Sequence, residues 1–263
     1  IFISQSGETA DTIAALKLSK EKGATTLAIS NVIGSSITRE ANYTIYTHAG
    51  PEIAVASTKA YSSQVVLLAI LAIYFAEVLD STSNEVLENL KSEILDLPVK
   101  ISSILDNTEE IKAFAKKVYT EKDMFFLGRG TDYNVALEGS LKLKEISYIH
   151  SEAYAAGELK HGPIALIENN VTVIGIITDP KLIEKSLSNM QEVITRGAKT
   201  LIITNQIIPS NHFNYVINIP HTSALLSPIL SVIPLQLLSY YISKNKGLDV
   251  DKPRNLAKSV TVE

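Results

Sequence analysis

The sequence predicts an α/β protein in which a parallel β-sheet covered by helices on both faces occurs twice. Short apolar segments typical of strands alternate with longer segments of helical spacing, a pattern that indicates parallel sheets. The chain also contains an internal repeat, since residues 22–31 (KGATTLAISN) align with residues 196–205 (RGAKTLIITN). The same offset places residues 1–4 on residues 175–178, so both copies have the order strand, helix, glycine turn, strand. We therefore expect two related domains.

Length and composition limit the classes of protein and partner. A chain of 263 residues with 46% hydrophobic and 20% charged residues is globular, with one or two domains and a large core. Its 24 basic and 28 acidic residues give a net charge of −4, and no basic run is present, so nucleic acid is not expected as a partner. The absence of cysteine excludes disulfides, thiolate metal sites and cysteine nucleophiles from this chain.

Each copy contains one long apolar stretch, which follows its third predicted strand. Residues 65–75 lie in the longest uninterrupted apolar run, which is shorter than the roughly 18 residues that indicate a membrane span. Residues 225–242 are broken by Pro228, Pro234 and several serines. We expect both to be buried helices, either inside a domain or against another subunit. No membrane association or export signal is expected, and the predicted location is the cytoplasm.

The two copies differ at their beginnings. The second has a strand pattern at residues 123–128 before its matching strand, whereas nothing precedes Ile1 in the first. Because an exposed sheet edge is an aggregation hazard, we expect the chain to start inside its first domain, with about a hundred or more residues preceding it. The predicted divisions are the C-terminal part of a first domain (1–82), a helical connector with amphipathic helices on either side of Pro98 (83–122), a second domain (123–250) and a tail (251–263).

The first candidate site is a hydroxyl-rich turn after the opening strand. Ser4, Ser6 and Thr9 lie between an apolar strand stub and a long helical pattern, so their hydroxyls and several backbone N–H groups can point at one anion near a helix N-terminus. Gly7 allows close approach of the backbone. The alternative is an ordinary N-cap. The turn is therefore a candidate phosphate site.

The densest polar stretch covers residues 136–163. Lys142 and Glu145 are three residues apart and Glu138 and Lys142 four apart, so each pair shares a helix face. Spacing alone favours surface ion pairs, which contribute a few tenths of a kcal/mol each. The functional alternative is a carboxylate held near a sugar carbon with a lysine beside it. A carboxylate can act as such a base when desolvation raises its pKa.

Histidine supplies the second set of candidates. His161 is followed by Gly-Pro, which ends the helical pattern and places the imidazole near a loop where it could face a ligand. His150 is a candidate by context, whereas the remaining three histidines have no supporting cluster. The alternative for any of them is a solvated or helix-capping residue. Histidine is the side chain best suited to proton transfer near neutral pH.

Two further segments complete the candidates. Ser57 precedes an apolar helix and is a natural N-cap, so that helix terminus could meet a polar ligand. The tail from residue 251 has neither helical nor strand periodicity, which is typical of a frayed end. Its basic centre gives an alternative, in which the tail closes over an anionic site.

Taken together, these motifs resemble the glucosamine-6-phosphate synthases. The matching segments are residues 4–9 (SQSGET), 55–59 (VASTK), 138–163 and 253–263, which cover nearly the whole chain in order. The likeness is to the C-terminal isomerase portion of that family, which is built from two sugar isomerase (SIS) domains. It implies two flavodoxin-like three-layer sandwiches, the first of them N-terminally truncated.

The resemblance implies an activity and its partners. Fructose 6-phosphate would be aminated and isomerised to glucosamine 6-phosphate, with ammonia supplied from glutamine by a separate glutaminase domain and with no metal or organic cofactor. That domain uses an N-terminal cysteine, so glutamine hydrolysis is not expected of this cysteine-free chain. The alternatives are a non-catalytic SIS regulator that binds sugar phosphates, and an aldose–ketose isomerase that works without amination.

The resemblance also assigns roles to individual residues. The phosphate would be bound by Ser4, Gln5, Ser6 and Thr9, and the sugar would contact Val55, Ser57 and Ala257. Glu145 would move a proton between C1 and C2, with Lys142 nearby. His161, from the neighbouring subunit of a homodimer, would help to open the ring, and Lys258 would contact the open-chain sugar or imine.

Overall fold

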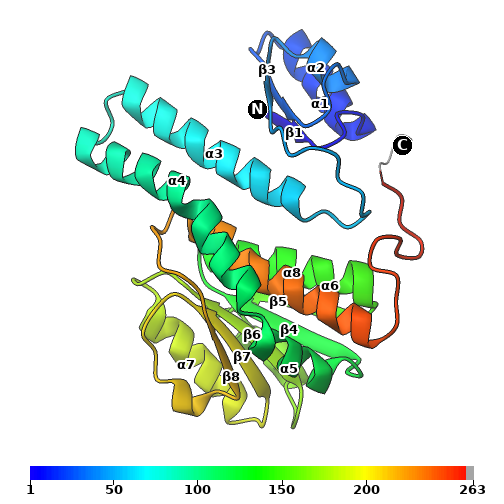
Figure 1. Ribbon diagram of the computed structural model, residues 1–263, viewed down its shortest axis with the longest axis vertical. Helices are drawn as coiled ribbons and strands as arrows, with labels where there is room; N and C mark the ends of the chain where they lie inside the picture. The colour runs from blue at the N-terminus through cyan, green and yellow to red at the C-terminus, as the bar shows by residue number, and fades with distance from the viewer. Residues whose placement is uncertain (259–263) are drawn as a thin grey trace. The chain divides into compact units, whose positions relative to one another are not determined.

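The computed structural model describes residues 1–258, which form two compact α/β units (Figure 1). The first unit comprises Ile1–Leu71 together with residues 251–258, and the second comprises Ala72–Val250. Residues 83–122, predicted as a connector, therefore lie within the second unit. The helix α3 (Lys59–Val78) runs from the first unit into the second.

The first unit contains a three-stranded parallel sheet in the order β1-β2-β3. Its strands are β1 (Phe2–Ser4), β2 (Leu27–Ser30) and β3 (Tyr43–Tyr46). The register pairs Ser4 with Ser30, so the two carboxyl ends lie side by side. The helices α1 (Ala10–Glu21) and α2 (Ser36–Glu40) connect the strands, and the core is made by Leu16, Ala28 and Ile37.

The second unit contains a five-stranded parallel sheet in the order β5-β4-β6-β7-β8. Its strands are β4 (Asp123–Gly128), β5 (His150–Ala155), β6 (Thr172–Ile177), β7 (Lys199–Thr204) and β8 (Tyr215–Asn218). The strand β6 is buried along its whole length, as expected for a strand covered on both faces. The prediction of parallel sheets flanked by helices is confirmed.

Helices cover both faces of this sheet (Figure 1). On one face lie α5 (Glu109–Val118), α6 (Thr131–Ser147) and α8 (Ser227–Asn245), and on the other lies α7 (Ile183–Ile194). The helices α6 and α8 pack closely because Gly139 faces Leu235, whose Cδ1 atom would lie 2.5 Å from any Cβ at that position. This packing fixes the buried face of α6.

The prediction that helices flank Pro98 is wrong, because α4 (Asn84–Asp106) continues through it. Proline lacks an N–H donor and usually kinks or ends a helix. Here Leu87, Leu97 and Ile104 are buried on one face of α4, and this burial offsets the loss of one backbone hydrogen bond. The helix α8 accommodates Pro234 in the same way.

The apolar helix α3 is largely uncovered by the described part of the chain. Only Ala60, Ala69 and Ile73 are buried, whereas large side chains such as Tyr74 and Phe75 are exposed. Burial of this helix inside a domain is therefore not observed in residues 1–258, and burial against another subunit stays a prediction. By length and composition it is the one helix in that range that could cross a membrane, with a mean hydropathy of 1.7. A single such helix is weak evidence for a membrane protein.

The turn after β1 provides a test of the local fold. Gly7 has φ +69°, and a Cβ there would lie 2.0 Å from the Oγ atom of Ser35. Gly23 has φ +83° but no atom within 4 Å of the same position. We expect Gly23→Ala to lower the free energy of unfolding by about 1 kcal/mol through backbone strain, and Gly7→Ala to lower it by roughly 1–3 kcal/mol more through the clash. Urea unfolding of both variants measures the difference, and equal losses would contradict it.

Candidate functional site

The turn that follows β1 is organised by its own hydroxyl groups. The Oγ atom of Ser4 shares a 3.0 Å hydrogen bond with Oγ1 of Thr9 and accepts another from the backbone N–H of Gly7, also at 3.0 Å. Ser6 Oγ accepts the N–H of Glu8 at 3.2 Å. These bonds hold the turn in one shape at the start of α1. The Ser4 hydroxyl is buried, whereas Ser6 and Thr9 are part-exposed and lie where a ligand can reach them.

A cavity of about 460 Å³ opens beside this turn. It is lined by residues from the turn, from the end of β2, from the loop after β3 and from the tail, namely Gln5, Ser6, Thr9, Asn31, Val32, Pro51, Glu52, Ala257 and Lys258. Five predicted site residues are thus brought together, and Ser4 lies beneath them. Asn31 and Glu52 were not predicted. Asn31 is the last residue of the repeated segment 22–31.

One polar atom of this site has no partner among the described residues. The side-chain oxygen Oε1 of Gln5 is buried and accepts no hydrogen bond there. A buried acceptor without a donor costs about 1–3 kcal/mol, so such a group indicates a ligand or water that donates to it. The site is therefore suited to a ligand that carries hydroxyl groups in addition to an anion.

The predicted role of Ser57 as an N-cap is wrong. The helix α3 begins at Lys59, and its first N–H groups are met by the Glu52 carboxylate, whose Oε1 accepts from Thr58 N at 2.7 Å. Ser57 Oγ instead donates to Oε2 of Glu52 at 2.9 Å. An acidic side chain is stabilised at a helix N-terminus by the helix dipole. Ser57 and Val55 are not among the residues that line the cavity.

The tail reaches the same cavity through its last described residues. The Lys258 ammonium donates a hydrogen bond to the backbone carbonyl of Ala54, and Val55 N donates to the carbonyl of Asp251 at 3.1 Å. These contacts attach the tail to the loop between β3 and α3. Lys258 is the one cation that lines the cavity within residues 1–258. The rest of the predicted closing tail, residues 259–263, lies outside the described residues.

The second unit contains a buried cluster of three charges on α6. Lys142 Nζ lies 2.6 Å from Oε2 of Glu145 and 3.5 Å from Oε1 of Glu138, and its side chain is 5% exposed. The predicted helix-face pairs are confirmed, but the alternative of surface ion pairs is wrong. The sequence could not show the burial because it depends on the packing of α6 against the sheet and α8. Burying ions is costly unless they are well paired, so such a cluster is typical of a functional site.

The electrostatics of the cluster favour proton exchange. Burial raises the pKa of the Glu138 carboxyl above its ordinary value, although the Lys142 ammonium opposes that shift. The Glu145 carboxylate also raises the pKa of Glu138, because protonation of Glu138 removes repulsion between the two acids. The Glu145 side chain is 21% exposed, which leaves it accessible to a ligand. Glu138, predicted only as a partner of Lys142, is therefore part of the candidate site.

The two histidine candidates have different surroundings. His161 ends the 3₁₀ turn Leu159–His161 and is exposed, as its Gly-Pro sequence predicts. No described hydrogen bond or ion pair joins it to the α6 cluster. The candidate His150 is instead a surface residue: its Nδ1 lies 2.8 Å from Oδ1 of Asp123, and its side chain is 61% exposed. It stands at the amino end of β5, whereas ligands of parallel sheets bind at the carboxyl ends.

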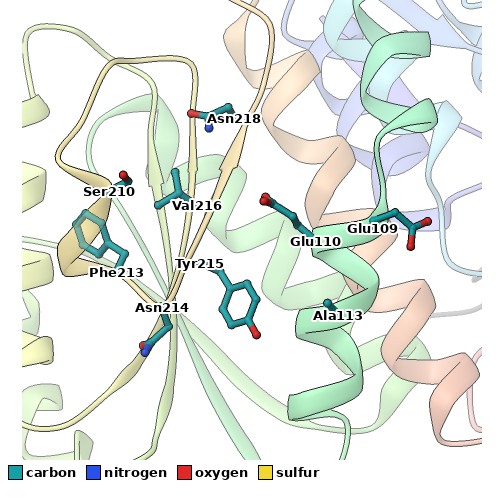
Figure 2. A pocket seen from close by; sticks show the side chains of 9 residues that line it. All are labelled: Glu109, Glu110, Ala113, Ser210, Phe213, Asn214, Tyr215, Val216 and Asn218. Carbon is teal, nitrogen blue, oxygen red and sulfur yellow. The ribbon is translucent and has the colours of Figure 1, made fainter.

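A second cavity, of about 650 Å³, lies between α5 and the edge strand β8 (Figure 2). The Glu110 carboxyl points toward β8, while that of Glu109 points away from it and binds Lys112 at 2.7 Å. Apolar and neutral side chains form most of the lining, and it contains no histidine or lysine. Its ionisable carboxyls, those of Glu109 and Glu110, therefore have no basic side chain beside them in the lining. Within residues 1–258, no group of three or more histidine, aspartate or glutamate residues could hold a metal ion.

Comparison with known proteins identifies the family. The model of the SIS domain family matches residues 1–74 and 117–243. The chain belongs to the SIS domain family. The matched segments are the β-sheets of both units with most of their helices, so the predicted fold class is confirmed.

The most similar curated relatives are aminotransferases. The chain is 60% identical to a glutamine–fructose-6-phosphate aminotransferase (isomerizing) of Clostridium perfringens and 49% identical to one of Thermococcus kodakarensis. Each alignment covers 100% of this chain but 44% of the relative, so the chain spans less than half of their length.

Solved structures agree with this placement. The C-terminal domain of the glucosamine-fructose-6-phosphate aminotransferase of Francisella tularensis matches with a TM-score of 0.90 and 40% identity, over 95% of this chain and 72% of that one. A glucosamine-6-phosphate deaminase of Thermotoga maritima matches with a TM-score of 0.73 and 24% identity, over 98% of this chain and 74% of that one. The second likeness shows the fold alone.

The buried cluster of the second SIS domain leads to a stability prediction. Lys142→Met removes the only ammonium between two buried carboxylates and should lower the free energy of unfolding by about 3 kcal/mol at neutral pH. The loss should shrink as the pH falls, because the pKa of Glu138 is already raised and its protonation removes the repulsion between the two carboxylates. Lys144→Met, at an exposed position on the same helix, is the control. Urea unfolding at two pH values measures both, and equal effects of the two substitutions would contradict the prediction.

Proposed function

We propose that this chain is the ketose–aldose isomerase part of a glutamine–fructose-6-phosphate aminotransferase, converting fructose 6-phosphate and ammonia to glucosamine 6-phosphate. The observation that carries the proposal is the buried cluster of Glu138, Lys142 and Glu145, because a protein that only binds sugar phosphates has no use for it. The relatives of 49–60% identity over the whole chain support this reaction over other isomerisations.

The first unit supplies phosphate recognition in this proposal. The phosphate binds at the start of α1 through Ser4, Gln5, Ser6 and Thr9, and Gln5 Oε1 also accepts a sugar hydroxyl. Lys258 contributes positive charge to a chain with a net charge of −4. Phosphate binding at a distance from the reacting carbons supplies energy that orients them. Val55 and Ser57 remain proposed sugar contacts. They lie in the loop between β3 and α3, to which Lys258 is bound through the carbonyl of Ala54.

The second unit supplies the proton transfer. His161 assists ring opening, after which ammonia condenses with the C2 ketone and releases water. Glu145 then takes a proton from C1 and delivers it to C2, while the C1 hydroxyl loses its proton and the imine nitrogen gains one. C1 is thereby oxidised to an aldehyde and the C2 imine is reduced to an amine, so no external redox partner is required. Lys142 stabilises the Glu145 carboxylate before it takes the C1 proton and after it has delivered that proton to C2, and Lys258 contacts the open-chain sugar or imine.

The proposal includes partners outside this chain. His161 is exposed and makes no described contact with the cluster, which fits a histidine that completes the site of a second subunit in a homodimer. Ammonia would come from a glutaminase domain, since the relatives are more than twice as long as this chain. The cytoplasm, where sugar phosphates and glutamine are available, is the proposed location.

The role of Glu145 can be tested by a conservative change. Glu145→Gln keeps the size of the side chain but cannot accept the C1 proton, so we expect turnover to fall by about 10³-fold or more while fructose 6-phosphate binds with nearly unchanged affinity. The control is Glu110→Gln, which alters the other cavity and should have parental activity. The assay uses the full-length protein with fructose 6-phosphate and ammonia and measures amino sugar.

Three outcomes would contradict this assignment. Parental turnover by Glu145→Gln would remove Glu145 from the mechanism. Tight binding without turnover by the unmodified full-length protein would favour a regulatory SIS protein. Isomerised product without any nitrogen donor would indicate an isomerase that does not aminate.

A further inference from the structure

The second SIS domain has the topological position at which parallel α/β sheets form a ligand crevice. Its chain leaves β4 toward β5 on one side of the sheet and continues from β6 to β7 and β8 on the other. The carboxyl ends of β4 and β6 therefore form the topological switch point, where such folds bind their ligands. The first turn of α6 follows β4 there, and Thr178 follows β6.

This crevice is occupied by a side chain of the protein itself. The Asp132 carboxylate accepts the backbone N–H of Thr178 at 2.8 Å and the Thr178 hydroxyl at 2.5 Å, and it receives a further hydrogen bond from the backbone of Asp179. Asp132 is 3% exposed and Thr178 2% exposed. Ser227, the first residue of α8, shares a 3.0 Å hydrogen bond with the Thr178 hydroxyl. Two amides and a hydroxyl thus surround one anionic group.

The internal repeat relates this arrangement to the first unit. The alignment of the two copies pairs Thr178 with Ser4, so the segment after β6 corresponds to the hydroxyl turn after β1. In the first unit, the only acidic side chain of residues 4–9 is Glu8, and its Oε1 is turned away to accept Ser36 N at 2.8 Å. The turn after β1 lies beside a cavity, and in the second unit the Asp132 carboxylate accepts the donors of the corresponding segment. The position that would match Asp132 in the first copy falls before Ile1, outside the sequence.

Burial acts against the charged form of the Asp132 carboxylate. Burial raises the pKa of the Asp132 carboxyl above its ordinary value even though three hydrogen bonds act in the opposite direction. The charged form is therefore held at a cost to folding at neutral pH. A residue retained at such a cost indicates a role beyond packing.

We propose that Asp132 is an internal anion that fills the ligand crevice of the second SIS domain and so excludes sugar phosphates from it. That the excluded ligand is a sugar phosphate rests on the proposed function. Each chain then binds one sugar phosphate, in the first domain, although both domains have the same fold. Asp132 acts as a specificity-determining residue and takes no part in the proton transfer.

The test removes the Asp132 carboxylate and supplies inorganic phosphate in its place. In Asp132→Gly the donors of Thr178 and Asp179 lose their acceptor, and inorganic phosphate should bind in the vacated crevice. The readout is the ¹⁵N amide signals of these two residues, titrated with phosphate against chloride at matched ionic strength. We expect saturable shifts in the variant and none in the parent protein. Asp179→Ser, which removes a nearby negative charge without opening the crevice, is the control and should behave as the parent.

Each result decides the proposal. Failure of phosphate to shift either amide in folded Asp132→Gly would overturn it, as would equal shifts in the parent protein. If Asp132→Gly does not fold in chloride, refolding in phosphate becomes the readout, and absence of rescue by phosphate would also overturn it. If the first unit fails to bind fructose 6-phosphate, only the proposed function is contradicted. The phosphate titration of Asp132→Gly does not depend on binding of the sugar by the first unit.

Discussion

The structure depends on one constraint: at the carboxyl end of a parallel strand, hydroxyl and backbone N–H groups converge and need an anion. In the second unit this need is met internally, by the Asp132 carboxylate on the donors of Thr178 and Asp179. In the first unit the hydroxyls of Ser4 and Thr9 bond each other and leave a cavity beside them. The same physical arrangement therefore yields a filled crevice in one copy and a candidate ligand site in the other.

The α6 cluster shows how the fold creates chemistry from ordinary residues. Glu138, Lys142 and Glu145 would contribute little on an exposed helix, where such pairs are screened by water. In the folded second unit the Lys142 side chain is buried and the two glutamates are partly buried, so the charges are less screened and burial raises the pKa of Glu138. The first unit is suited to holding an anion and the second to moving a proton, which is the division that an isomerase of a phosphorylated sugar requires.

Local chemistry made part of this predictable from the sequence. The hydroxyl turn, the face shared by Lys142 and Glu145, and the loop position of His161 follow from residues within a few positions of one another. The burial of Lys142 and the capping of α3 by Glu52 depend on contacts between separate segments, which a single pattern does not encode. Asp132 was missed because an acidic residue in the first turn of a helix is ordinary; a signal was available in its position after the switch-point strand.

Hydrophobicity gave the least reliable predictions. The apolar composition of α3 indicates that the helix is covered, but it does not say by what, and among the described residues only Ala60, Ala69 and Ile73 of this helix are buried. Pro98 was expected to separate two helices, yet the buried face of α4 continues through it. In both cases the outcome depends on neighbours of the helix, which its own sequence does not specify.

The most direct measurement is a crystal structure of the full-length protein with fructose 6-phosphate. The account predicts that the phosphate contacts the turn at residues 4–9 of the first unit and that C1 and C2 of the sugar lie beside the Glu145 carboxylate, with the Asp132 crevice still closed. A phosphate bound elsewhere, or a Glu145 side chain directed into solvent and away from the sugar, would contradict it.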